Sequence, residues 1–208
     1  VPELPRIRLS SLDPVEIDDD LWRLIAEEQR LMPHLHLSLQ AGDDMVLKRM
    51  KRRHLRQDVL DVCRRARGYR DDIVFGADII AGFPTETDEM FDNTLRIVDE
   101  CDLTFLHVFP YSERPGTPAA RMPQVEKKLR SERAARLREA GRNRYNAFLK
   151  NHCNKEREVI VEKGNIGRTE HYAPVTLEET KGLKLDSGQL HKVRTTGIDN
   201  QMLTGHIL

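Results

Sequence analysis

The chain has 208 residues, of which 38% are hydrophobic and 33% charged, a composition typical of a soluble globular protein with one or two domains. No apolar run approaches the roughly 18 residues that a membrane-spanning helix needs, and the amino terminus lacks the pattern of a signal peptide, so we expect no membrane association and a cytoplasmic location. Three widely spaced cysteines indicate neither a metal site nor a disulfide framework.

The net charge is zero, but the basic residues are concentrated in two blocks. Ten Lys and Arg lie between Lys48 and Arg70, and eleven lie between Lys127 and Arg157. Such blocks are typical of a surface that faces a polyanion, but they also occur on solvated helix faces. The sequence leaves both interpretations open.

The first half of the chain alternates strand and helix patterns. We expect strands at residues 6–11, 34–40, 73–80 and 103–111, separated by helical segments that include 44–53 and 56–67. This alternation predicts a parallel α/β sheet. Since four strands are too few to close the usual barrel, we expect a partial (β/α) barrel that contains later strands only, within a longer protein.

A sharp turn follows the third expected strand. Gly82 and Pro84 break the strand, and Thr85 has the features of an N-cap for a helix that carries Phe91, Leu95 and Val98. A glycine at the carboxyl end of a parallel strand lets a ligand approach the backbone closely. The turn therefore predicts one wall of a ligand site, or merely a change of chain direction.

The second half has a different pattern. After a Pro- and Gly-rich loop at 112–123, residues 124–150 predict one long basic helix. Short alternating runs then predict a small five-stranded barrel, with strands expected at 158–162, 169–175, 192–198 and 202–207, a turn at 163–165, and further segments near Gly182 and Gly188.

Polar side chains gather where the expected strands end: Ser10, Ser11, Ser38, Gln40, Asp78, Gly82, His107 and Tyr111. On a parallel sheet they converge at one rim and predict a pocket for a polar small molecule. His34 and His36 share a strand face and could bind a metal with a third ligand, but alternating histidines are more often structural. We therefore predict no metal ligands, and no catalytic residues are visible.

Four segments carry a resemblance to a known family: RIRLSSLDP from Arg6, HLHLSLQAGDDMVLKRMKRRH from His34, DIIAGFPTET from Asp78 and LHVFPYSERPGTPAARMP from Leu106. In order and spacing they resemble the radical S-adenosylmethionine methylthiotransferases, and among these most closely the branch that acts on tRNA threonylcarbamoyladenosine. The tail resembles the family's TRAM domain. Thr85 stands where the family usually has glycine.

The resemblance implies three regions: 1–123 as the later part of the radical domain, 124–150 as a connecting helix and 151–208 as a TRAM barrel. It implies S-adenosylmethionine as cofactor, [4Fe–4S] clusters in the intact enzyme, and tRNA as partner, with no stable protein partner predicted. The implied cofactor-binding residues are Ser10, Gln40, Asp78, Gly82 and Tyr111, and the implied RNA-binding residues are Lys155, Arg157, Arg168, Lys192 and Arg194.

One departure bears on activity. The family's CxxxCxxC motif and the three cysteines of its amino-terminal domain have no counterpart here. The chain is therefore expected to be a fragment that is inactive alone, from an enzyme that adds a methylthio group to C2 of N6-threonylcarbamoyladenosine next to the anticodon. The alternatives are a ribosomal-protein aspartate methylthiotransferase and a non-catalytic RNA-binding protein.

Overall fold

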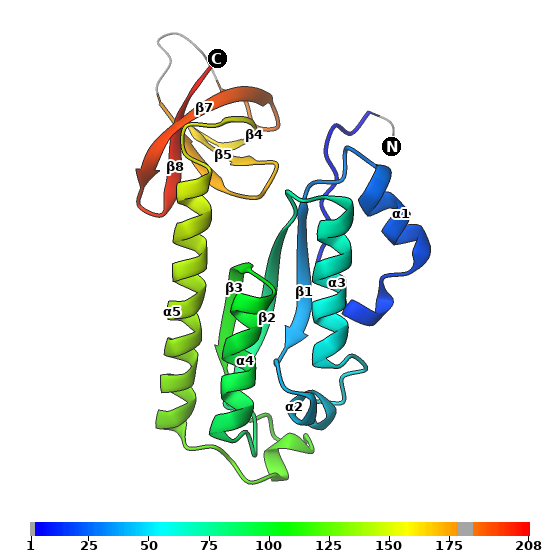
Figure 1. Ribbon diagram of the computed structural model, residues 1–208. Coiled ribbons are helices and arrows are strands. Elements are labelled where there is room, and N and C mark those ends of the chain that lie inside the picture. Colours follow the sequence, from blue (N-terminus) through cyan, green and yellow to red (C-terminus); the bar gives the residue numbers. More distant parts are fainter. Residues whose placement is uncertain (1–2, 179–184) are drawn as a thin grey trace. The chain divides into compact units, whose positions relative to one another are not determined.

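The computed structural model describes residues 3–178 and 185–208 (Figure 1). The chain forms two compact units, one containing residues up to 31 and 35–144, the other containing residues 32–34 and 145–208. The boundary falls within the long helix α5, between Arg144 and Tyr145. Among the described residues, no helix combines the length and the apolar character needed to cross a membrane.

The first unit is built from alternating strands and helices. In chain order these are η1 (Pro14–Glu16), α1 (Asp19–Glu27), β1 (His34–Gln40), α2 (Asp44–Arg49), α3 (Arg56–Tyr69), β2 (Val74–Ala81), α4 (Asp88–Glu100), β3 (Leu103–Pro110), η2 (Ala119–Arg121) and the first part of α5 (Lys127–Asn151). The α/β class predicted from the sequence is confirmed.

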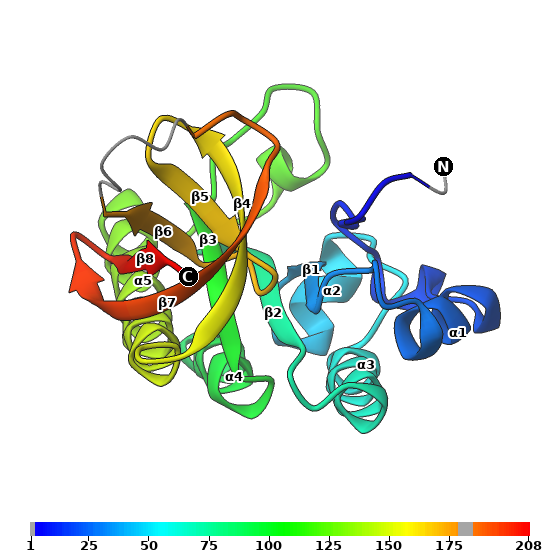
Figure 2. The ribbon, with the colours of Figure 1, turned by 90° about the horizontal axis from the view of Figure 1, so that it is seen from above.

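The three strands form a sheet in the order β1-β2-β3, and β2 pairs with β3 in parallel. Helices α3 and α4 lie on one side of this sheet (Figure 2). Every second strand residue, such as Leu37, Phe75 and Ile79, is buried in the apolar core on one face. Because strand side chains alternate between faces, the intervening residues, such as His36 and Asp78, occupy the opposite face.

The strand expected at residues 6–11 is replaced by two isolated parallel bridges, Ile7 with Leu31 and Leu12 with Leu37. Ile7 and Leu12 are five positions apart in the sequence, whereas their partners Leu31 and Leu37 are six positions apart. The register therefore slips by one residue between the two bridges. A one-residue slip interrupts the hydrogen-bond ladder. The sheet of the described residues therefore has three strands rather than the four that were expected.

The turn after β2 also differs from the prediction. Helix α4 begins at Asp88, and its N-cap is Thr87, whose hydroxyl accepts a hydrogen bond from the Met90 N–H at 3.3 Å. Thr85 lies within the turn at a φ of 67° and donates its N–H to the Pro123 carbonyl at 3.0 Å. The prediction of Thr85 as N-cap was wrong because the turn is two residues longer.

The second unit contains a closed five-stranded barrel in the order β4-β5-β6-β8-β7, as predicted. Its strands are β4 (Glu156–Lys163), β5 (Ile166–Thr169), β6 (Pro174–Leu177), β7 (Leu190–Asp199) and β8 (Met202–Ile207). The strand expected at 169–175 is interrupted by a turn: Thr169 ends β5, Pro174 begins β6, and Tyr172 between them has a φ of 71°. Gly182 lies outside the described residues, and the TRAM assignment stays a prediction.

Candidate functional site

The carboxyl ends of the three strands border a pocket with a volume of about 600 Å³. This rim pocket is lined by Gln40, Asp78, Ile80, Phe109, Pro110, Tyr111, Ser112, Arg114, Thr117 and Ala119. Ligand pockets are commonly about 300–1,000 Å³, and in parallel α/β sheets they lie at this edge. Of the residues predicted at the rim, Gln40, Asp78 and Tyr111 line this pocket.

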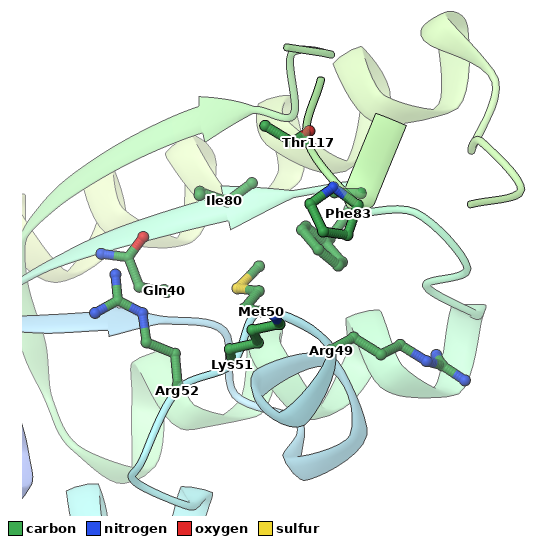
Figure 3. A pocket seen from close by; sticks show the side chains of 10 residues that line it. Gln40, Arg49, Met50, Lys51, Arg52, Ile80, Phe83 and Thr117 are labelled. Carbon is green, nitrogen blue, oxygen red and sulfur yellow. The ribbon is translucent and has the colours of Figure 1, made fainter. Parts of the chain in front are cut away.

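A smaller basic pocket of about 310 Å³ shares Gln40, Ile80, Thr117 and Ala119 with the rim pocket (Figure 3). Its other lining residues are Arg49, Met50, Lys51, Arg52, Phe83 and Pro118. Three of them carry positive charge, so this side of the rim favours an anionic group of a ligand. These residues belong to the first basic block of the sequence, and their position in that block did not indicate a contact with the rim.

Gln40 lies at the junction of the two pockets. It is the last residue of β1 and has a φ of 65°, in the left-handed region that residues other than glycine seldom adopt. Such backbone strain is concentrated at ligand sites. In Figure 3 its amide group lies near the ends of the strands, where it can both donate and accept hydrogen bonds.

The Asp78 carboxylate is the centre of a cluster on the same sheet face. Its Oδ1 atom lies 3.0 Å from His36 Nε2 and 3.1 Å from His107 Nδ1. The two imidazole rings are 4.8 Å apart between centroids. Asp78 and His107 were predicted at the rim, and His36 was predicted to share a site with His34. The structure instead brings His36 to Asp78 and His107.

Tyr111 continues the rim beyond β3. Its N–H donates to the Ala81 carbonyl at 2.8 Å, and its ring packs edge-on against Phe83 with centroids 5.3 Å apart. The Arg130 guanidinium donates to the Tyr111 carbonyl at 3.2 Å and to Glu113 at 3.0 Å. Arg130 therefore positions this part of the rim, a role that its place in a basic helix did not suggest.

Gly82 has a φ of 72°, and a Cβ atom there would lie 2.6 Å from Arg130 Cγ and 3.0 Å from Arg130 Cα. The close packing of α5 against this turn thus leaves no room for a side chain at position 82. Neither Gly82 nor Ser10 lines the two pockets described above, and Ser10 is exposed. Their predicted contacts with a cofactor stay predictions.

A buried ion pair fixes the Gly82 turn. The Glu86 carboxylate accepts hydrogen bonds from the Gly82 N–H at 2.9 Å and from Arg133 Nη1 at 2.9 Å, and Arg133 Nη2 donates to Asp88 at 2.6 Å. Burial raises the pKa of the Glu86 carboxyl, and Arg133 opposes this shift. The sequence signal that could have identified Glu86 is its place in the GFPTET segment beside Gly82.

The predicted RNA-binding residues lie on the barrel. Arg157 contacts Glu170 at 3.4 Å, Arg168 contacts Glu162 at 2.9 Å, and Arg194 is paired with Glu156. The two lysines, Lys155 and Lys192, are exposed. The arginines thus already share their charge with carboxylates, which reduces the positive potential available to an RNA backbone.

The cysteines do not fit an iron–sulfur cluster, which is held by several converging thiolates. Cys63 and Cys101 are buried in the first unit, where their mutual hydrogen bond and burial raise the pKa of the Cys63 thiol. Cys153 donates to the Leu149 carbonyl within the second unit. Cys63 and Cys101 are hydrogen-bonded to each other in the core, and Cys153 is hydrogen-bonded to a helix carbonyl. The three cysteines therefore do not provide a set of cluster ligands.

Sequence comparisons identify known proteins that are similar to this chain. Residues 4–98 match the family model of the radical SAM superfamily. The chain is 54% identical to the threonylcarbamoyladenosine tRNA methylthiotransferase MtaB of Rickettsia prowazekii over 96% of this chain and 46% of that protein. It is 36% identical to a tRNA-2-methylthio-N(6)-dimethylallyladenosine synthase of Ehrlichia chaffeensis over 82% of this chain and 40% of that protein.

Among solved structures, the chain is similar to the radical SAM enzyme coproporphyrinogen III oxidase (HemN) of Escherichia coli, with a TM-score of 0.49 and 22% identity over 70% of this chain and 32% of that chain. This likeness is too distant to support a function. The chain spans less than half the length of the two curated relatives named above.

Proposed function

Since the chain belongs to the radical S-adenosylmethionine methylthiotransferases, we propose that it forms part of an enzyme that adds a methylthio group to C2 of N6-threonylcarbamoyladenosine, next to the anticodon of tRNA. The observation that carries this proposal is the 54% identity, over 96% of the chain, to a protein named for that modification. Relatives named for the dimethylallyladenosine substrate share less identity, 36% in the case cited above.

The rim pocket supports a role in holding S-adenosylmethionine. Its volume of about 600 Å³ suits a cofactor of that size, and it combines the Gln40 amide, the Asp78 carboxylate and the Tyr111 ring. Amide and carboxylate groups suit hydroxyl and amino groups, and an aromatic ring suits a nucleobase. When bound, S-adenosylmethionine supplies the radical precursor and the methyl group, while these residues bind and orient it.

We further propose that the cluster-holding cysteines belong to a part of the enzyme outside this chain and that the chain alone is inactive. The support is the misfit of its three cysteines and its coverage of only 46% of the Rickettsia relative. Anaerobic addition of iron and sulfide to the chain should leave no stable visible chromophore. A persistent chromophore with stoichiometric iron would contradict this part of the proposal.

The proposed reaction is tested on the tRNA of cells that lack the protein. Mass spectrometry of nucleosides should show threonylcarbamoyladenosine without its methylthio group, while the methylthio group on isopentenyladenosine is retained. If the tRNA is unchanged and a ribosomal-protein aspartate loses the group, the enzyme acts on protein instead. If neither changes, the non-catalytic RNA-binding alternative replaces the proposal.

The cofactor pocket is tested by isothermal titration of the protein with S-adenosylmethionine. Gln40→Ala removes one amide from the pocket, and the loss of one or two hydrogen bonds should weaken binding about five- to tenfold. Gln57→Ala is the matched control, because Gln57 lies on α3, lines neither pocket and hydrogen-bonds to Asp61 one turn along the same helix. Equal affinities of the two variants would place the cofactor elsewhere.

We propose tRNA as the partner of the barrel, contacted by Lys155, Arg157, Arg168, Lys192 and Arg194, and a cytoplasmic site of action. The exposed lysines, Lys155 and Lys192, support this surface, whereas the three arginines are already paired with carboxylates. Retention on immobilised tRNA should fall steeply with salt, because phosphate contacts release counterions. Salt-insensitive or absent retention would rule out this partner surface.

A further inference from the structure

We propose that His36, Asp78 and His107 form a binding site for one divalent transition-metal ion, distinct from any iron–sulfur cluster. The three residues come from three neighbouring strands, β1, β2 and β3. Two imidazoles and one carboxylate are a ligand set typical of zinc and of non-haem iron(II). The inference does not depend on the reaction proposed above.

The distances fit a shared ion. One nitrogen from each imidazole and one carboxylate oxygen lie within 4.8 Å of one another, and the two nitrogens are 3.0 and 3.1 Å from Asp78 Oδ1. Ligands that each lie about 2.0–2.2 Å from a metal are separated from one another by about 3 Å. An ion can therefore enter between these atoms with only small side-chain adjustments.

The sheet holds the ligands in place. Asp78 and His107 are direct cross-strand partners in the parallel pairing of β2 with β3. His36 lies over Gly76, where a Cβ atom would be only 2.5 Å from the His36 Nδ1 atom. Any side chain at position 76 would displace the His36 ring, so the sequence leaves the space that this ligand needs.

The charge of the cluster also favours a cation. The Asp78 side chain is only 26% exposed, and in the described part of the chain its hydrogen bonds and ion pairs go to these two imidazoles. A partly buried carboxylate is stabilised by a positive partner. A bound divalent ion would provide that partner.

The site is open on one side. Asp78 lines the rim pocket, and the His107 side chain is 61% exposed. Three protein ligands with a free coordination position are typical of catalytic rather than structural metal sites. The free position would bind water or an oxygen or nitrogen atom of the molecule in the rim pocket.

Cobalt(II) is the probe, since it absorbs visible light when bound by nitrogen and oxygen ligands. The untagged protein, stripped with a chelator, is titrated anaerobically, and we expect saturation at one equivalent with a visible band. His107→Ala and Asp78→Asn should each weaken binding at least tenfold and remove the band. Because His107 is largely exposed, its replacement leaves the core intact.

His206→Ala is the matched control, because His206 is an exposed histidine on β8 of the barrel and lies outside the cluster. It should bind cobalt as the unchanged protein does. Absence of saturable binding would show that the cluster is only a hydrogen-bonded His–Asp–His arrangement. Binding that His107→Ala and Asp78→Asn leave unchanged would place the ion elsewhere, and either result overturns the proposal.

Discussion

The buried pair of Arg133 and Glu86 gives the sharpest prediction for stability. Their side chains are 3% and 0% exposed, and the Glu86 carboxylate also accepts the Gly82 N–H at the turn. Arg133→Met keeps the apolar stem but removes the guanidinium. Among the described residues it leaves the buried carboxylate with one donor, the Gly82 N–H, so we expect the free energy of unfolding of the first unit to fall by about 3–5 kcal/mol.

The loss should depend on pH. Burial already raises the pKa of the Glu86 carboxyl above its ordinary value of 4.5, and removal of Arg133 raises it further. A carboxyl whose folded-state pKa is raised favours the folded state below the unfolded pKa, and this contribution is lost as pH rises through the folded value. The deficit of Arg133→Met should therefore be smaller at pH 5 than at pH 8.

Urea unfolding followed by tryptophan fluorescence measures this effect, because the single tryptophan, Trp22, is buried in the first unit. Arg136→Met is the matched control on the same helix, since the pair of Arg136 with Asp92 is about half exposed and should contribute less than about 1 kcal/mol. If Arg133→Met costs no more than Arg136→Met, the reasoning from burial is refuted.

Three further substitutions test separate features. Thr85→Gly should raise the free energy of unfolding by about 1 kcal/mol, because it relieves a left-handed backbone at a φ of 67°. A lower free energy of unfolding, measured with urea, would contradict this. Gly42→Ala places a Cβ atom 2.7 Å from the Thr94 backbone and should destabilise by at least about 2 kcal/mol; an unchanged urea midpoint would show that α4 can move. Burial lowers the pKa of His152 below 6.5, so the barrel should lose stability as pH falls from 6.5 through the folded value. His152→Asn should remove this dependence in circular-dichroism melts; the same pH slope in both proteins would refute it.

The sequence predicted the parts of the fold that depend on repeating patterns. The period-two alternation of Leu35, Leu37 and Leu39 placed β1 correctly, and turn signals spaced along the tail predicted the five-stranded barrel. It failed at residues 6–11, where the alternation is present but a one-residue slip in register prevents a ladder. Register depends on the partner strand and is not visible in one segment alone.

The candidate site was predicted in part for the same reason. Gln40, Asp78 and Tyr111 follow from the rule that parallel strands present their carboxyl ends at one edge, and all three line the rim pocket. The joining of His36 to His107 depends on strand order, which places β2 between the two histidine-bearing strands. The contact can therefore be inferred only when the pairing of β1 with β2 and the pairing of β2 with β3 are both known.

The basic blocks show how charge can be misread when partners are unknown. In α5, guanidinium groups face the carboxylates of neighbouring elements of the first unit: Arg130 with Glu113, Arg133 with Glu86 and Asp88, Arg136 with Asp92, and Arg144 with Asp99 and Asp102. A phosphate competes poorly for a guanidinium that already has a carboxylate partner, so these arginines serve mainly to hold α5 against the unit that carries the rim. The salt dependence of tRNA binding should therefore reflect far fewer contacts than the eleven basic residues of the block. It should also be lowered more by replacing the exposed lysines, such as Lys127 and Lys150, than by replacing the paired arginines.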